Sequence, residues 1–171
     1  MRQTRPMQTN AGYVVRRAVA SDADAIAALS LVAQEVHREA APDRVKPGDI
    51  AALAALFAEE LAAPDSVILL AETGEQVVGY VYAKVTAQSE TAFSYAHTTL
   101  HVHQLAVSPS HRRGGAATGL MRGIEDEASV RRINEATLVY WNFNSAAANL
   151  FQSLGYSQQS HRMRKTLQGG S

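Results

Sequence analysis

The segment that most constrains the fold is an apolar strand that leads directly into a turn of small residues and then into a helix. Residues 105–107 are apolar, residues 108–117 are rich in Ser, Gly and Ala, and Leu120, Met121 and Ile124 follow at helical spacing. Such a helix must bury its apolar stripe against the sheet that contains the strand. The segment therefore predicts an α/β architecture.

The rest of the chain alternates strand-like and helix-like segments. Glu72-Thr73-Gly74-Glu75 between two apolar runs predicts an antiparallel hairpin, because Gly tolerates positive φ. The expected strands are residues 13–19, 67–71, 77–85, 100–107, 136–141 and 161–167. The expected helices run from a cap at 21–24 to Ala40, from a cap at Asp49 to Leu61, and over 115–128 and 145–154. Residues 86–98 are expected to form a loop that shapes a substrate site. This order predicts a mixed α/β sheet covered on both faces.

The amino-acid composition indicates the domain size and excludes some classes of binding partner. The chain has 171 residues, 46% of them apolar, which suits one domain over residues 11–167 with flexible tails at 1–10 and 168–171. Lys plus Arg (16) equals Asp plus Glu (16), so the chain lacks the positive field of a typical nucleic-acid or anionic-membrane binder. We therefore expect neither nucleic acid nor membrane as a partner.

The absence of cysteine excludes a disulfide framework, thiolate-bound zinc and a cysteine nucleophile. The first ten residues carry no apolar core of a signal peptide, and no run approaches the roughly 18 apolar residues of a membrane span. A cytoplasmic location is expected.

The turn at 108–117 has the features of an anion-binding site. Small residues at 114–117 let a ligand approach the backbone, and the free N–H groups and dipole of the following helix favour negative charge. Arg112 and Arg113 can add charge-assisted hydrogen bonds to a phosphate. The alternative is a merely flexible turn with solvated arginines. A Walker A loop is excluded because no Gly-Lys-Ser/Thr follows.

These residues resemble the GNAT (GCN5-related N-acetyltransferase) family. Arg112, Gly115 and Ala117 match the family signature Q/R-x-x-G-x-G/A, and Asn144 to Tyr156 is similar to the family's N-x-x-A-x-x-L-Y-x-x-x-G-F. The resemblance in element order covers about residues 13–167. It implies a GNAT-like fold, with a mostly antiparallel sheet, helices on both faces and a splay between the strands at 100–107 and 136–141.

The same resemblance implies acetyl-CoA as co-substrate and transfer of its acetyl group to a primary amine of a small molecule or peptide. The turn amides would bind the pyrophosphate, and the pantetheine arm would lie in the splay. The implied CoA-binding residues are Leu105, Ala106, Val107, Arg112, Arg113, Gly114, Gly115, Ala116, Ala117, Thr118, Asn144 and Phe151. Asn144 is equally compatible with a helix N-cap. A homodimer is allowed, with residues 161–167 as a possible edge.

Proton transfer is where the sequence departs from the family. Phe151 stands where the family often has a tyrosine acid, and a phenyl ring donates no proton. His101 and His103 are two apart on a strand, so we expect them to share a face with Leu105. Imidazole can replace the family's acidic base, and we favour His103 over His101.

Other roles for these groups remain open. The two histidines can instead form an ordinary cross-strand pair. A metal site formed by His97, His101 and His103 is disfavoured, because no Asp or Glu lies at a spacing typical of a metal ligand. Tyr140 and Tyr156 are replacement acids in principle, although Tyr156 is better explained as a core aromatic.

Two further functions compete with catalysis. The missing tyrosine at Phe151 allows a CoA or acyl-CoA sensor or partner-binding module without turnover. An unrelated phosphate-binding α/β protein is a weaker alternative. No residue selects the acceptor amine.

Overall fold

The computed structural model describes residues 7–8 and 12–167. The chain forms two compact units, the first ending at Val139 and the second beginning at Tyr140. The expected tails 1–10 and 168–171 lie outside the described residues, apart from Met7–Gln8. The single domain expected over 11–167 stays a prediction.

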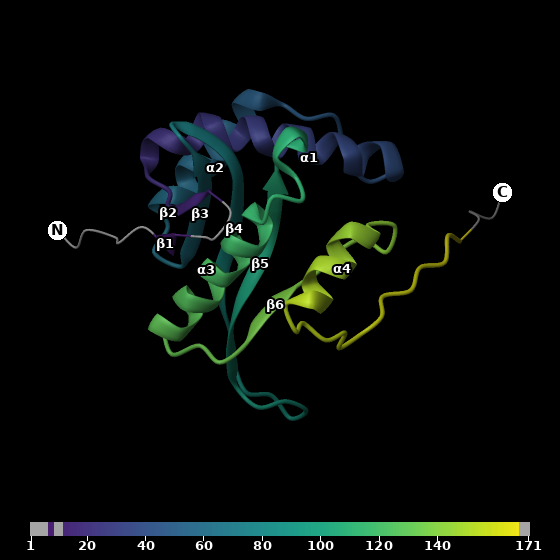
Figure 1. Ribbon diagram of the computed structural model, residues 1–171. Coiled ribbons are helices and arrows are strands. Elements are labelled where there is room, and N and C mark those ends of the chain that lie inside the picture. The colour runs from purple at the N-terminus through teal and green to yellow at the C-terminus, as the bar shows by residue number, and fades with distance from the viewer. Residues whose placement is uncertain (1–6, 9–11, 168–171) are drawn as a thin grey trace. The chain divides into compact units, whose positions relative to one another are not determined.

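The first unit is built on one sheet (Figure 1). Among the described residues its strands lie in the order β1-β2-β3-β4-β5-β6, and all neighbours are antiparallel except β5 and β6, which are parallel. The strands are β1 (Met7–Gln8), β2 (Val14–Arg17), β3 (Ser66–Thr73), β4 (Gln76–Gln88), β5 (His97–Val107) and β6 (Ala136–Leu138).

Helices cover both faces of this sheet. The helices α1 (Ala23–Ala40) and α2 (Ile50–Ala62) pack on one face, and α3 (Ala116–Val130) packs on the other (Figure 1). Two short 3-10 helices, η1 (Ala20–Asp22) and η2 (Pro109–His111), precede α1 and α3. The α/β fold class predicted from the sequence is confirmed.

Alternation along β3 supplies both layers of the core. Ile68 and Leu70 pack with Phe57 of α2, whereas Leu69 faces α3. A Cβ added at Gly123 of α3 would stand 2.7 Å from Leu69 Cδ1, so the glycine lets the helix lie close to the sheet. Because both faces are covered, β3 is buried continuously over residues 66–71 and β4 over residues 78–83.

The helix starts follow the predicted capping residues in one case and differ in another. The Asp49 carboxylate accepts two backbone N–H groups in the first turn of α2, at 3.0 and 3.2 Å, as predicted. At α1, Asp22 occupies the N-cap position but makes no cap bond to the helix. Its carboxylate instead accepts from Val19 N at 2.7 Å and from Arg16 at 2.7 and 2.9 Å, which closes η1.

The predicted hairpin between β3 and β4 is confirmed, with Gly74 in its turn at φ 60°. The loop predicted over 86–98 is shorter, because β4 and β5 stay paired as far as Gln88 and His97. The strand predicted over 161–167 was wrong, since residues 157–167 form no strand. Met163 and Leu167 are 93% and 78% exposed, so the alternation there has no core to face. The homodimer stays a prediction.

The expected splay lies between β5 and β6. The two strands pair only where Leu100–Val102 meets Ala136–Leu138, and β5 continues to Val107. From His103 to Val107, β5 therefore has no β6 partner in the described part of the chain. On that side its backbone polar groups lack a partner strand, although Val107 O accepts a hydrogen bond from Arg112.

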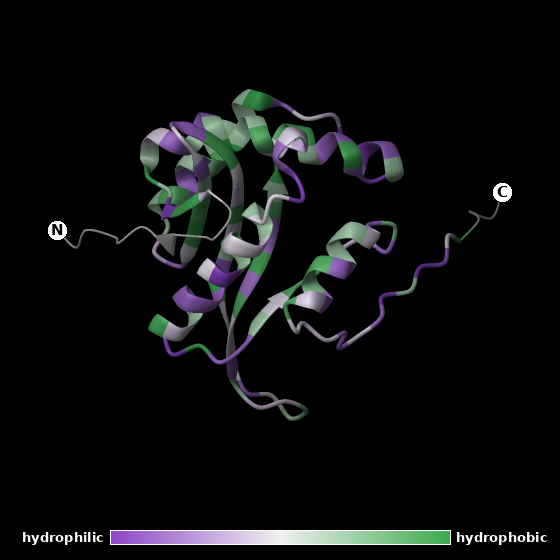
Figure 2. Cartoon of the chain, viewed as in Figure 1, coloured by the Kyte–Doolittle hydropathy of each residue, from purple (hydrophilic) through white to green (hydrophobic). Residues whose placement is uncertain are grey.

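The second unit contains α4 (Ser145–Ser153), whose start is capped by Asn144: Oδ1 accepts from Ala147 N at 3.0 Å. Phe151 is buried and packs against Tyr140 and Tyr156, with ring centroids 6.0 Å apart in both cases. The stretch after the helix is mostly hydrophilic, as Figure 2 shows.

Candidate functional site

The turn after β5 presents the N-terminus of α3. The strand ends at Val107, Ser108 N donates to Val78 O at 2.8 Å, and η2 then turns the chain toward the helix. Gly115 is the N-cap of α3, at φ 88°, and a glycine offers no side chain to cap the first-turn N–H groups. These N–H groups, at Ala116 to Thr118, are the donors that an anion would use.

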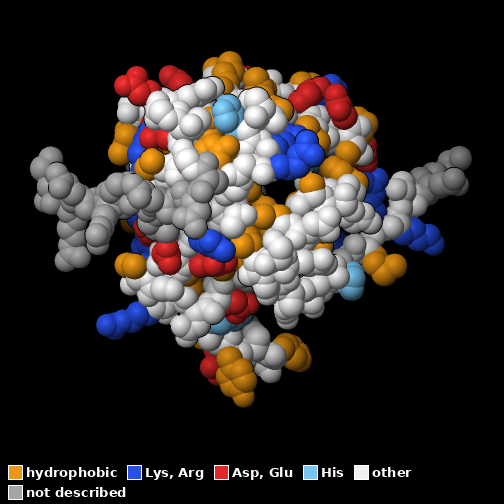
Figure 3. Space-filling model, viewed as in Figure 1, with side chains coloured by type: hydrophobic (Ala, Val, Ile, Leu, Met, Phe, Trp, Pro, Cys, Tyr) orange, Lys and Arg blue, Asp and Glu red, His pale blue; other side chains and the backbone are white. Residues whose placement is uncertain are grey.

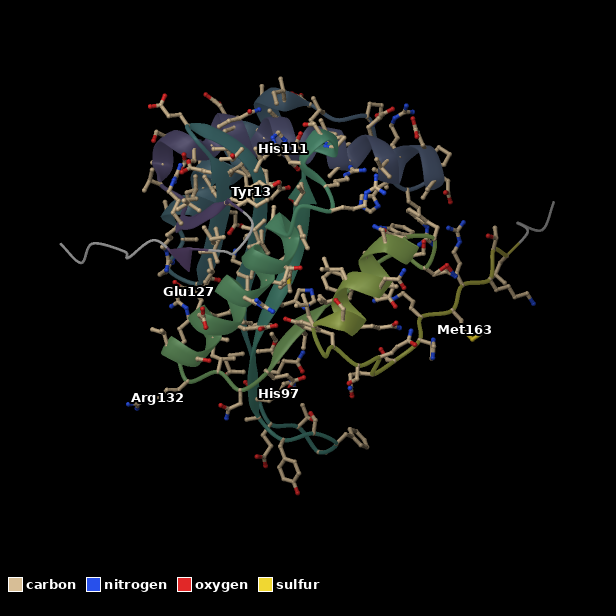
Figure 4. All side chains as sticks on the ribbon, viewed as in Figure 1. Tyr13, His97, His111, Glu127, Arg132 and Met163 are labelled. Carbon is tan, nitrogen blue, oxygen red and sulfur yellow. The ribbon has the colours of Figure 1, made fainter. Side chains whose placement is uncertain are left out.

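Gly114 and Gly115 are required for different reasons. Gly115 adopts a left-handed backbone conformation, which side chains disfavour. At Gly114 an added Cβ would lie 2.4 Å from the Tyr13 hydroxyl oxygen. Tyr13 also donates to His111 O at 3.5 Å, and Figure 4 shows the two residues near each other. Tyr13 is therefore part of the turn's support, which sequence reasoning missed.

The two arginines expected to contact phosphate are both exposed at this turn. Arg112 Nε donates to Val107 O at 3.3 Å, so its side chain folds back over the end of β5. Arg113 has φ 62°, an unfavourable left-handed conformation for a residue with a Cβ. The structure thus keeps both positive charges beside the N-terminus of α3, and their contact with phosphate stays a prediction.

A bulge in β5 decides which side chains share a face. Tyr82 of β4 pairs with Gln104, whereas the next residue of β4 pairs with Val102, which leaves His103 as the extra residue. His101 and His103 lie together, as expected. Leu105 pairs with Val81 and faces α3, so the expectation that it would share the histidines' face was wrong. The bulge inverts the alternation between His103 and Leu105.

His103 lies between two rings. Its imidazole is stacked on Tyr82, with centroids 5.1 Å apart and planes 22° apart, and the His101 ring approaches it edge-on at 4.9 Å. Partial burial lowers the pKa of His103, and the charges of His101 and Lys84 lower it further, against the opposing effect of Glu60. The imidazole remains accessible to solvent and is neutral near pH 7, which suits a proton acceptor.

His101 is held more firmly than His103. Its Nδ1 lies 2.8 Å from Thr137 Oγ1 of β6, so one of its two ring nitrogens is already engaged. The preference for His103 as the base stays a prediction.

Polar side chains of α2 and β4 surround this pair. The Glu60 carboxylate accepts hydrogen bonds from Ser66 and Lys84, and the Tyr82 hydroxyl also stabilises its charged form. Burial alone would raise the pKa of Glu60, but these hydrogen bonds hold it below its usual range. The alternation Tyr80, Tyr82, Lys84 on β4 was the available sequence signal for this cluster.

Gln104 belongs to a buried network on the same face. Its Oε1 accepts from the Tyr80 hydroxyl at 2.6 Å and from Ser30 Oγ at 3.4 Å. Burial raises the pKa of Tyr80 to about 12. The network ties α1 to β5 directly beside His103.

The remaining candidates make contacts within the fold, and the CoA-binding role predicted for Asn144 and Phe151 stays a prediction. Asn144 caps α4 and Phe151 is a core residue of the second unit, where Tyr156 packs against it. His97 starts β5 at the end opposite to His111, as Figure 4 shows, and its Nδ1 lies 3.1 Å from Tyr95 O. In the described residues no group of three or more His, Cys, Asp or Glu side chains could hold a metal ion.

Surface charge is mixed on the visible face. Figure 3 shows basic and acidic side chains interspersed over this face. None of the helices in residues 7–8 and 12–167 is both long and apolar enough to cross a membrane.

Solved structures share the fold at low sequence identity. A mutant of the BH1408 protein from Bacillus halodurans is 19% identical, with a TM-score of 0.86, and the match covers 90% of this chain and 99% of that one. A predicted acetyltransferase of Clostridium acetobutylicum with acetyl-CoA is 18% identical (TM-score 0.67; 90% and 96% covered). AAC(6')-Iy in complex with the bisubstrate analog CoA-S-monomethyl-acetylneamine is 15% identical (TM-score 0.70; 91% and 98% covered).

Sequence comparison gives the family. A curated relative, "Acetyl transferase GW6a" of Oryza sativa subsp. japonica, is 37% identical over an alignment of 106 residues, and the match covers 56% of this chain and 25% of the relative. The chain therefore spans about a quarter of that protein. The sequence model of the Acetyltransferase (GNAT) family matches residues 33–156, which is most of the chain. The chain belongs to the GNAT acetyltransferase family.

Proposed function

We propose that this protein transfers the acetyl group of acetyl-CoA to a primary amine of a small molecule or peptide. The observation that carries the proposal is the arrangement along β5. His103 lies at the start of the segment without a β6 partner, and the N-terminus of α3 follows the end of that segment. At about 3.3 Å per residue, His103 and Val107 are roughly 13 Å apart along the strand.

In this proposal the backbone holds the co-substrate. The N–H groups at 114–118 bind the pyrophosphate, with Arg112 and Arg113 adding charge. The pantetheine arm pairs with backbone groups of Leu105 to Val107 on the side without a β6 partner, and Arg112 moves off Val107 O to reach the phosphate. The thioester then lies near His103.

The chemistry needs one proton acceptor. The nitrogen of the amine attacks the thioester carbonyl, and His103 takes the proton that this nitrogen loses. A backbone N–H of β5 stabilises the oxyanion that forms. The C–N bond forms, the C–S bond breaks, and CoA leaves as a thiolate. A thiol has a pKa of about 8.5, so the thiolate can leave without a protein acid and take its proton from solvent or from the His103 imidazolium. Phe151 is not required to replace the family's tyrosine.

Thiol release from acetyl-CoA tests the proposal across a panel of amines: neamine, a polyamine, free amino acids and a peptide with a free N-terminus. We expect turnover with at least one amine, and a 10²- to 10⁴-fold lower kcat in His103→Ala, with unchanged CoA affinity. His97→Ala is the matched control, because His97 lies on the same strand at its other end, and it should leave kcat unchanged.

The pH profile gives an independent check. Because the pKa of His103 is lowered, its neutral form persists below pH 6.5, so the acidic limb of kcat/KM should lie below that pH. Equal kcat in wild type and His103→Ala would remove the histidine base. If the protein binds CoA but acetylates none of the amines, it is instead a sensor or partner-binding module. The absence of any thermal shift with CoA would contradict both functions.

The cytoplasmic location expected from the composition belongs to the same proposal. A protein without cysteine can work in a reducing or an oxidising compartment, so its composition does not fix the location. The proposed location therefore rests on the proposed use of acetyl-CoA.

A further inference from the structure

Tyr82 lies next to the candidate base, His103, and interacts with the ion pair of Glu60 and Lys84. Its ring is stacked on the His103 imidazole, and the Glu60 carboxylate acts on its hydroxyl group, whose pKa it helps to raise. We infer that Tyr82 is a positioning residue, which holds the His103 imidazole in place by stacking while its hydroxyl group interacts with the Glu60 carboxylate. This inference rests on the proposed role of His103 as the base.

The Tyr82 ring is itself fixed. The residue is 8% exposed, and Phe57 of α2 contacts its ring edge-on, at 6.2 Å between centroids and 83° between planes. A buried ring held from one side by a helix offers a rigid face to its other neighbour. His103, as the extra residue of the bulge, lies against that face at 5.1 Å.

The carboxylate that interacts with the hydroxyl end is fixed as well. Glu60 is held by Lys84, whose Nζ lies 3.0 and 2.9 Å from its two carboxylate oxygens, and by Ser66. Burial, reinforced by Glu60, raises the pKa of Tyr82 to about 12, so the hydroxyl keeps its proton as a donor near neutral pH. Tyr82 is thus held at its ring, and its hydroxyl group interacts with a carboxylate that is itself fixed.

The charges that face His103 come from three elements. Glu60 lies on α2, Lys84 on β4 and His101 on β5, while Asp65, which precedes β3, lies 3.8 Å from Lys84 Nζ. The Lys84 and His101 charges lower the pKa of His103, and the Glu60 charge raises it. Removing Glu60 or Lys84 must therefore shift the His103 titration in opposite directions.

An NMR titration of the His103 imidazole measures this directly, and it does not depend on turnover. In Tyr82→Leu the stacked ring is lost and His103 becomes more hydrated, so we expect its pKa to rise toward the ordinary value. We also expect kcat to fall at least tenfold while CoA affinity stays unchanged. Tyr82→Phe keeps the ring, so its effect on both quantities should be smaller.

Tyr80→Phe is the matched control. It deletes a hydroxyl two residues away on the same face, where the ring also packs on Phe57 but the hydroxyl binds Gln104. The His103 titration should be unchanged in this variant. An unchanged titration and an unchanged kcat in Tyr82→Leu would overturn the positioning role, and so would equal shifts in Tyr80→Phe and Tyr82→Phe.

A second pair of variants decides the matter if Tyr82→Leu does not fold. Glu60→Gln should lower the pKa of His103 and Lys84→Met should raise it, and shifts of the same sign or no shift would overturn the network. The two proposals fail separately. If the titration responds as expected but no amine is acetylated, the positioning of His103 stands and the proposed function falls.

Discussion

The segment of β5 without a β6 partner, from His103 to Val107, has different chemical groups at its two ends. At the turn after Val107 the candidate anion site consists of backbone N–H groups, and side chains matter there mainly by being absent, as at Gly115. Around His103 the candidate proton site consists of side chains from α2, β4 and β5. The first site depends on local backbone conformation, and the second depends on packing between distant segments.

Among the variants that distinguish the two ends, we expect Gly115→Val to have the largest effect, on CoA affinity. A β-branched residue is strained at φ 88°, so the first-turn N–H groups should no longer converge, and CoA affinity should fall about 10- to 100-fold. The His103 titration should not change. Calorimetric titration with CoA measures the loss.

Gly74→Val provides the matched control, because Gly74 has φ 60° in a hairpin turn of the same unit, with nothing within 4 Å of an added Cβ. It should lower stability without weakening CoA binding. Equal losses of CoA affinity in both variants would mean that strain, and not the local turn, controls binding.

Gly114→Ala tests the support of the turn. The new methyl group would collide with the Tyr13 hydroxyl oxygen at 2.4 Å, so we expect the free energy of unfolding to fall by about 1–3 kcal/mol. Tyr13→Phe removes that oxygen and should recover part of the loss in the double variant, as measured by urea denaturation. Additive losses would show that the two residues are not coupled.

Arg113→Gly should have the smallest effect and two opposite consequences. Removing the Cβ at φ 62° relieves strain and should stabilise the fold by up to about 1 kcal/mol. Removing the positive charge should weaken CoA binding a few-fold, and this loss should diminish at high salt. A salt-independent loss would argue against a charge contact with phosphate.

The difference between the two ends also explains which features the sequence could predict. The turn and the Asp49 cap depend on neighbouring residues, so local patterns were sufficient. The facing of Leu105 could not be predicted, because alternation assumes a regular strand and the bulge at His103 arises from pairing with β4.

Long-range packing accounts for the other misses. Glu60 and Tyr82 are 22 residues apart in the sequence, and only the packing of α2 on the sheet joins them. Residues 161–167 alternate as a strand does, but a strand also needs a partner and a buried face, and their apolar side chains are exposed. Pattern alone therefore predicted a strand that does not form.

The central claim is that the backbone turn binds CoA while the histidine face is left for the acceptor. A ¹H–¹⁵N NMR titration with CoA, which carries no acetyl group to transfer, tests it most directly. We expect the amides of residues 105–107 and 114–118 to shift on binding, with the His103 imidazole still titrating. Unchanged amides at 114–118 in a saturated complex would contradict the account.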